Sequence, residues 1–192
     1  MSGRTLLGDE RDLVRGCLQG DQRAFARLVD QYKALVFNLA LRTVPDREAA
    51  EDVAQETFVR VYRNLASFRG AAKLSTWIYQ IAYRTCLEEL QRPHHRQQYA
   101  FLDEDSEGVG HSLSDPAAEE VFAQHELRQL LDYHMARLPP RPRLALTLYY
   151  LHDRRYQEIA QIMEQPIGTV KTHLHRAKRY LRQYMSAEGA NA

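Results

Sequence analysis

Cysteine is scarce in this chain of 192 residues. The two cysteines, Cys17 and Cys86, stand far apart and neither belongs to a CxxC pair. Their scarcity and spacing argue against a disulfide framework and a cysteine-rich zinc site, and favour a reducing, cytoplasmic environment. We expect both thiols to lie in the core; a redox role is the less favoured alternative.

Long apolar runs are also missing. Residues 1–15 carry charges throughout and lack the apolar stretch of a signal peptide. No later segment approaches the run of about 18 apolar residues that spans a bilayer. The sequence therefore predicts a cytoplasmic protein without membrane insertion.

Signatures of catalysis are lacking as well. The chain has no phosphate-cradling glycine loop, no nucleophile elbow and no metalloprotease helix. The neighbouring carboxylates Glu88 and Glu89 would diverge by about 100° on a helix, which suits solvation better than paired acid–base chemistry. We expect no enzyme activity and no cofactor.

Charge is present but unevenly placed. Residues 1–92 hold 14 basic and 12 acidic side chains, residues 93–136 hold 2 and 9, and residues 137–192 hold 10 and 4. An acidic middle between a weakly basic and a strongly basic segment indicates two domains, at least one of which faces a polyanion.

Apolar residues recur at helical spacing on both sides of this acidic segment, and no sustained alternation of a strand occurs. The predicted fold is all-α, with two small helical domains joined by a flexible acidic linker. We place the first domain at 1–92, the linker at 93–118, the second domain at 119–186 and a tail at 187–192. Asp21 and Asp46 are the expected N-caps of two long helices in the first domain.

Residues 156–179 have the pattern of a helix-turn-helix. In its second helix, Pro166 and Thr169 suit the start, and one face is apolar. The apolar face consists of Val170, Leu174, Ala177 and Leu181. The opposite face is basic and hydrogen-bonding, as a major groove requires. It consists of Lys171, Thr172, His175, Arg176, Arg179 and Arg182. The alternative is an ordinary solvated face. A metal site is disfavoured, because His173 and His175 would point about 200° apart.

Aromatic and basic residues mix around a helix break at 68–70. The aromatic members are Phe68, Trp77, Tyr79 and Tyr83, and the basic ones are Arg60, Arg63, Arg69, Lys73 and Arg84. This composition suits a single nucleic-acid strand, which is held by its phosphates while its bases stack. The competing interpretation is that Trp77 is simply a core residue.

Several strings follow one another in the first domain, namely residues 21–25, 28–32, 50–58, 67–69, 75–77 and 81–82. In this order they resemble the promoter-melting domain of extracytoplasmic-function sigma factors of RNA polymerase. Residues 156–179 are similar to the second DNA-binding domain of that family. The sequence departs from the family pattern at His173, Leu74, Thr85 and Glu88, which implies altered base preference more than loss of role.

The resemblance implies three sets of site residues. Those for the coiled coil of the polymerase's largest subunit are Tyr32, Asp52, Gln55, Glu56 and Phe58. Those for the separated strand of the −10 element are Arg60, Arg63, Phe68, Arg69, Lys73, Ser75, Thr76, Trp77, Gln80 and Arg84. Those for the −35 element are Thr169, Lys171, Thr172, His175, Arg176 and Arg179. The implied partners are core polymerase, including its flap, promoter DNA, and an anti-sigma factor that covers both domains.

Two other functions remain open at this point. An autonomous helix-turn-helix regulator would bind duplex DNA without polymerase, although the first domain offers it no evident ligand pocket or dimer heptad. A purely protein-binding adaptor or decoy would make the basic face incidental.

Overall fold

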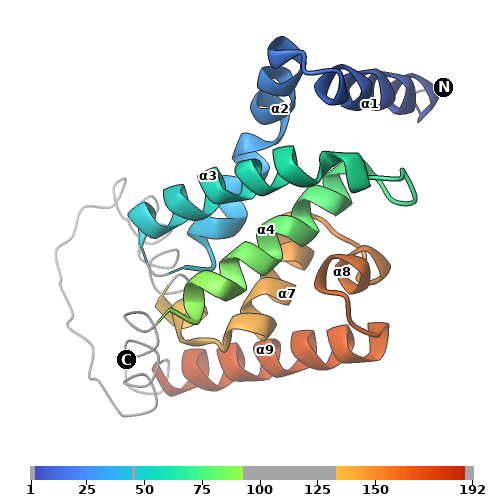
Figure 1. The fold of residues 1–192 in the computed structure, drawn as a ribbon. Helices are drawn as coiled ribbons and strands as arrows, with labels where there is room; N and C mark the ends of the chain where they lie inside the picture. Colours follow the sequence, from blue (N-terminus) through green and yellow to red (C-terminus); the bar gives the residue numbers. More distant parts are fainter. Residues whose placement is uncertain (1–2, 45, 93–132, 189–192) are drawn as a thin grey trace, which may run out of the picture.

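The computed structural model describes residues 3–44, 46–92 and 133–188 (Figure 1). The linker predicted at 93–118 and the start of the predicted second domain lie outside the described residues. The described parts contain helices and no strand, which confirms the all-α prediction. No helix among them is long and apolar enough to cross a membrane.

The described part of the N-terminal domain contains four α-helices and a short 3₁₀ turn. They are α1 (Gly3–Leu18), α2 (Gln22–Leu41), α3 (Arg47–Asn64), η1 (Leu65–Ser67) and α4 (Leu74–Leu90). Asp21 Oδ1 accepts a hydrogen bond of 2.8 Å from the backbone N–H of Arg23, and Asp46 Oδ1 accepts one of 2.7 Å from Ala49. Both predicted N-caps are therefore confirmed. Gly20, at a φ of 82°, provides the left-handed turn between α1 and α2.

The C-terminal domain has three described α-helices beyond a short helical stretch at 133–137. They are α7 (Pro140–Tyr150), α8 (Tyr156–Met163) and α9 (Ile167–Glu188). Helix α7 was not predicted, because the Leu138-Pro139-Pro140 break hid it, although proline suits the first turn of a helix. The α8–α9 turn passes through Glu164, whose left-handed φ of 52° ends α8.

Each domain buries the apolar faces of its helices. In the first, α2 packs on α3 and α4 around Leu28, Val36, Val61 and Ile78, all fully buried. In the second, α7, α8 and α9 enclose Leu144, Leu148, Ile159 and Val170, which are also fully buried. Burying side chains of this size contributes roughly 1.5–3 kcal/mol each relative to leaving them exposed.

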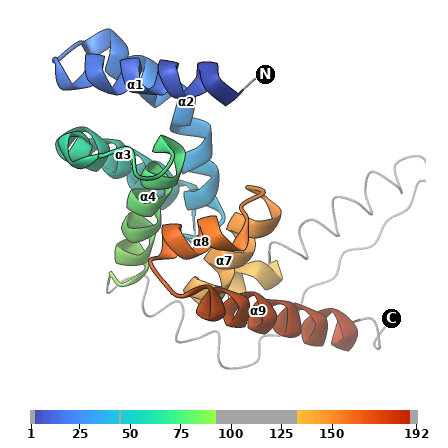
Figure 2. The same cartoon turned by 90° about the vertical axis from the view of Figure 1, so that its right-hand side faces the viewer.

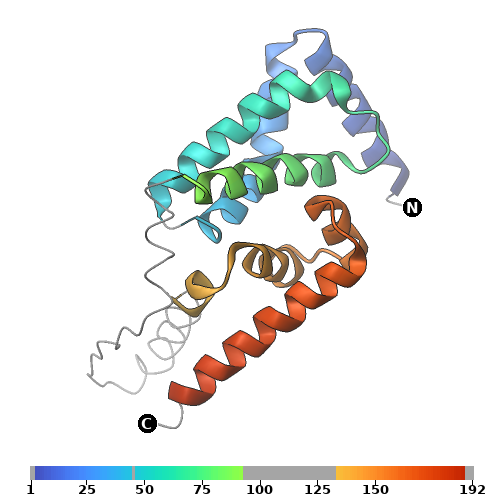
Figure 3. The same ribbon diagram turned by 60° about the horizontal axis from the view of Figure 1, so that its bottom comes forward.

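The two domains also pack on each other, which the sequence analysis did not predict. Helix α8 lies against α4, and the apolar core runs without a break from one domain into the other. Figures 2 and 3 show α7 and α8 between the N-terminal helices and α9, while α1 lies on the opposite side of the molecule from α9.

Arg143, on α7, is a buried joint between the domains, with an exposed fraction of 2%. Its guanidinium donates to the backbone oxygen of Thr43, in the turn that follows α2, at 2.8 Å. It also donates to the carbonyls of Leu138, at 2.9 Å, and of Ala136. Because buried carbonyls need partners, this one side chain ties the start of α7 to the N-terminal domain.

Candidate nucleic-acid and polymerase interface

The second helix of the helix-turn-helix, α9, has two unlike faces. Val170, Leu174 and Ala177 are buried against α7 and α8, and Leu181 is half-buried. All six residues of the predicted outer face are exposed, namely Lys171, Thr172, His175, Arg176, Arg179 and Arg182. The predicted division of this helix into a core face and a basic outer face is confirmed.

The first turn of α9 begins two residues before Thr169. Thr169 is half-buried, and its backbone N–H donates to the Pro166 carbonyl at 2.9 Å, so it lies inside the first turn instead of capping it. The hydroxyl of Thr172 donates to the Gly168 carbonyl at 3.0 Å. The helix that begins here has 22 residues, and the positive end of its dipole lies at this first turn.

His173 does not share the outer face. It is half-buried, and its Nε2 lies 3.0 Å from Gln165 Oε1, so it ties α9 back to the preceding turn. Burial, followed by the positive charges of Arg141 and Arg176, lowers the pKa of His173. His175 is exposed, so the two histidines face different surroundings, as the helical spacing predicts.

A residue that sequence reasoning missed is Lys178, at the edge of the outer face. Its Nζ lies 5.3 Å from the centre of the Tyr150 ring and 5.7 Å from that of Tyr149. These contacts couple α9 to the end of α7.

The aromatic and basic residues around the helix break form a mixed surface. Phe68 and Trp77 are half-buried, with ring centres 5.4 Å apart, and both pack against the core. Arg63, Arg69 and Lys73 are exposed nearby along the chain. Trp77 therefore belongs partly to the core and partly to the surface, which combines the two interpretations of the sequence.

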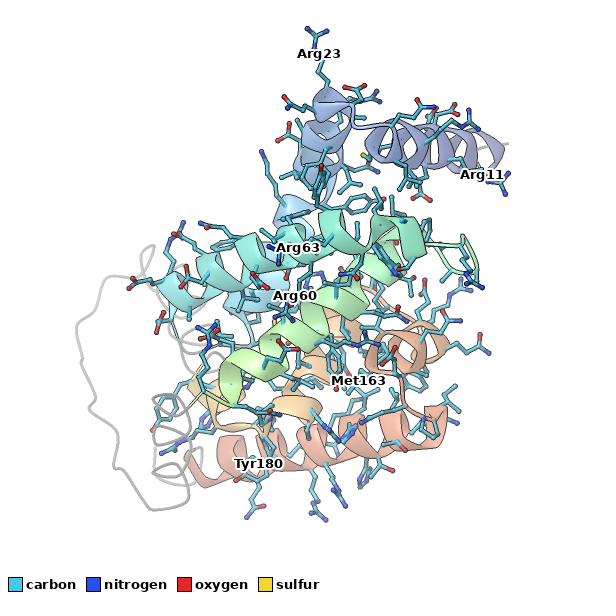
Figure 4. All side chains as sticks on the ribbon, in the orientation of Figure 1. Arg11, Arg23, Arg60, Arg63, Met163 and Tyr180 are labelled. Carbon is cyan, nitrogen blue, oxygen red and sulfur yellow. The ribbon has the colours of Figure 1, made fainter. Side chains whose placement is uncertain are left out.

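Three other residues of the predicted −10 set lie in less open places. Thr76 is buried with an exposed fraction of 2%, and Ser75 is half-buried. Arg60 bridges α3 and α4, with Nε 2.7 Å from Glu56 and Nη1 2.6 Å from Glu88. The bond to Glu56 raises the pKa of Arg60. Figure 4 shows Arg60 and Arg63 on α3.

The residues predicted to bind polymerase are mostly accessible. Asp52 and Gln55 are exposed, and Glu56 and Phe58 are half-buried. A polar groove of about 460 Å³ between α3 and α4 is lined by Asp52, Gln55 and Glu56, among others.

Tyr32 differs from the other residues of this set. Its exposed fraction is 4%, and its hydroxyl donates to Glu10 at 3.2 Å. Burial and the Glu10 carboxylate raise the pKa of Tyr32 above the ordinary range. It therefore supports the position of α2 against α1 and presents little surface of its own.

The same face of α4 that carries the predicted −10 residues meets α8. Gln80 Nε2 donates to the backbone oxygen of Gln161 at 2.9 Å. Lys73 Nζ lies 3.7 Å from Glu158, and Arg84 pairs with Glu164. Three side chains of the predicted −10 set are thus bonded to the helix-turn-helix domain, a contact that no local sequence pattern indicated.

Fold and surface together define an all-helical protein with two parts, one of which is a helix-turn-helix with an exposed basic face. Two family descriptions match the chain, sigma-70 region 2 over residues 28–96 and sigma-70 region 4 over residues 128–181.

Curated relatives match over nearly the full chain. The RNA polymerase sigma-H factor of Pseudomonas aeruginosa is 36% identical over 90% of this chain and 93% of that protein. The ECF sigma-E factor of Escherichia coli K12 is 37% identical over 86% and 88%, and SigW of Bacillus subtilis is 32% identical over 90% and 94%. The chain belongs to the extracytoplasmic-function group of the sigma-70 family. It is accordingly a sigma factor, a transcription initiation factor that directs RNA polymerase to promoters.

Two solved structures share the fold. CnrH, in complex with the cytosolic domain of CnrY, matches with a TM-score of 0.63 and 19% identity over 93% of this chain and 98% of that chain. The sigma factor RpoE of Bartonella quintana, in complex with the anti-sigma factor NepR, matches with a TM-score of 0.61 and 20% identity over 84% and 96%.

Proposed function

We propose that the exposed basic face of α9 reads the −35 element of promoters. The observation that carries this proposal is the division of α9, whose buried residues Val170, Leu174 and Ala177 hold it on α7 and α8 while its outer face stays open. Lys171 and Arg176 are exposed on this face, where they can reach base edges or phosphates.

The −10 element is captured at the other domain. Phe68 and Trp77 provide faces on which bases stack, and Arg63, Arg69 and Lys73 provide charges for the phosphates of one strand. Extruding a base costs a few kcal/mol, which stacking and polymerase binding must supply. No nucleotide hydrolysis is part of this step.

Core polymerase binds the polar face of α3 and the groove that α3 forms with α4. Asp52 and Gln55 are exposed there, and Phe58 offers an apolar contact beside them. An interface with an apolar centre and a charged rim favours partner selection by charge. The chain would then act in the cytoplasm, where polymerase and chromosome meet.

An anti-sigma partner is part of the proposal. Both solved relatives were obtained with a second protein bound, the cytosolic domain of CnrY in one and the anti-sigma factor NepR in the other. Such a partner would hold the domains away from DNA until a signal releases them.

The test is run-off transcription from a promoter library, with core polymerase alone and with the full chain added, scored by sequencing the transcripts. The proposal predicts initiation at a defined two-part sequence only when the chain is present. The variant K171A/R176A should lose most of this initiation, whereas K33A, which removes an exposed lysine of α2, should retain it. Tight duplex binding without initiation would instead support the autonomous regulator, and initiation unaffected by K171A/R176A would support the adaptor.

A further inference from the structure

Acidic side chains outnumber basic ones among the described residues that line the groove between α3 and α4. The acidic ones are Asp52, Glu56, Glu88 and Glu89, and the basic ones are Arg60 and Arg92. Arg92 Nη1 lies 3.1 Å from Glu89 Oε2, so these two charges pair with each other. Among these lining residues, Arg60 remains to balance the carboxylates of Glu56 and Glu88.

The guanidinium of Arg60 is held from both sides of this groove (Figure 4). Its Nε lies 2.7 Å from Glu56, one turn earlier on α3, and its Nη1 lies 2.6 Å from Glu88, on α4. The two bonds involve different nitrogens of a rigid, planar group, so together they fix its orientation. Because each bond is mutual, Arg60 also restricts the positions of the two carboxylates.

A second arginine–glutamate pair on α3 shows what distinguishes Arg60. Arg47 Nε lies 2.9 Å from Glu51, also four residues away on the same helix, but its side chain is 73% exposed. The side chain of Arg60 is 31% exposed and joins α3 to α4. A DNA phosphate could bind Nε or Nη1 of Arg60 only by displacing a carboxylate, whereas Glu56 stays bonded to it without DNA.

We propose that Arg60 is a positioning residue for polymerase binding, which holds Glu56 and Glu88 across the groove, and that it is not a contact for the −10 strand. The inference rests on the proposed binding of core polymerase at this groove. Without Arg60, the carboxylates of Glu56 and Glu88 lose their shared partner, and Glu56 is no longer held towards the polymerase. Glu88 then acts through the same groove, although its departure from the family pattern implied a change in base preference.

The first measurement is the affinity of the labelled full chain for core polymerase, by fluorescence anisotropy without DNA. R60A should weaken binding by about fivefold, the size of effect expected for coupling within one network of ion pairs. E88Q should also weaken binding, and R60A/E88Q should bind no more weakly than R60A, because both changes break one network. R47A, which breaks the matched pair on α3, should bind like wild type. Circular dichroism checks that every variant is folded.

The second measurement distinguishes a polymerase role from a DNA role. Polymerase is saturated with each protein, and its binding to a promoter returned by the transcription library is followed against salt concentration. Each phosphate contact that is lost lowers the slope of log affinity against log salt by about one. R60A should leave both this slope and the base preference in the −10 element unchanged once polymerase is saturated.

Three results would overturn the inference. The first is wild-type affinity of R60A for polymerase. The second is weak binding by R60A with E88Q unchanged, which would make Arg60 a direct polymerase contact. The third is a salt slope lowered by about one for R60A, which would make it a phosphate contact.

The variant D52A distinguishes these failures from failure of the proposed function. If D52A weakens polymerase binding while R60A does not, polymerase binds the groove without Arg60, and only the positioning role is wrong. If D52A and Q55A both bind polymerase like wild type, the proposed polymerase site is wrong and the inference fails with it.

Discussion

The two proposed DNA surfaces differ in how much of each is covered by the protein itself. The outer face of α9 is open, and its six predicted residues are all exposed. The face of α4 is partly occupied, because Gln80 and Arg84 bond to α8. The comparison teaches that the helix-turn-helix domain has two unlike sides: the basic face of α9 is exposed, while α8 packs on the face of α4 that we propose for the −10 element.

The largest effect on stability is expected at Arg143, which joins the two domains. The change R143L removes the donor for three backbone carbonyls, two of which, those of Thr43 and Leu138, lie in buried contacts. Carbonyls left buried and unpaired cost about 1–3 kcal/mol each, so we expect a loss of about 3 kcal/mol in the free energy of unfolding. Urea denaturation followed by circular dichroism measures it. A loss below about 1 kcal/mol would mean that Arg143 does not hold the joint.

A smaller loss of stability is expected at Tyr79, in the contact between the two domains. The change Y79F keeps the ring and removes the hydroxyl that bonds to His152. A hydrogen bond of this kind contributes about 1 kcal/mol, which is the expected loss of stability by urea denaturation. Y62F, at an exposed tyrosine of α3, is the matched control and should change nothing.

Acid should weaken the contact between the two domains, because His152 lies in it. Burial, followed by the charge of Arg154, lowers the pKa of His152 from 6.5 to about 4. Its Nε2 is buried without a hydrogen-bond partner in the described part of the chain, so a second proton adds a buried charge. The neutral form favours folding: its contribution is complete above pH 6.5 and is lost as the pH falls towards 4.

The effect of His152 on stability must be distinguished from the effects of other titratable groups. Burial raises the pKa of Tyr79 to about 12, so its hydroxyl stays protonated between pH 7 and 5, and the pKa of the nearby Glu158 is lowered, chiefly by its backbone bond to Arg155. The pKa of His173 is also lowered, so its protonation likewise reduces stability as the pH falls. We therefore expect H152Q to lose less stability than wild type between pH 7 and 5. Equal losses in the two proteins would contradict the assignment.

The smallest effect is expected at Asp153, in the turn between α7 and α8. Its backbone has a φ of 53°, a left-handed conformation that glycine adopts without strain. D153G should raise the free energy of unfolding by about 0.5 kcal/mol, because part of the gain is offset by the greater freedom of glycine in the unfolded chain. Thermal unfolding would show an unchanged or lower midpoint if the turn carries no strain.

Local features of the structure could be predicted from the sequence, and distant contacts could not. The caps at Asp21 and Asp46 and the two faces of α9 depend on residues within about one or two helical turns, so spacing alone specifies them. The bond between Tyr79 and His152 joins positions 73 residues apart, and that between Arg84 and Glu164 joins positions 80 apart. Such pairs carry no periodic signal in a single chain.

Burial explains the other differences. Tyr32 and Thr76 match family positions by residue type, but the packing of α1 on α2 and of α4 on its neighbours determines that they are buried. Arg143 appears in the sequence as one more basic residue of a basic domain. Only the structure shows that its charge is turned inward to carbonyls.

The most direct test of the account is to ask whether the two surfaces read separate parts of one promoter. Library transcription with core polymerase would be repeated with R176A, on α9, and with R69A, beside the helix break. We expect R176A to relax base preference by about tenfold in the upstream element alone, as the loss of a base contact worth about 1–3 kcal/mol implies. R69A, which removes a charge that faces the phosphates of the separated strand, should weaken use of the downstream element and leave base preference in the upstream element unchanged. A change in both elements from either substitution, or in neither, would contradict the assignment of one DNA element to each domain.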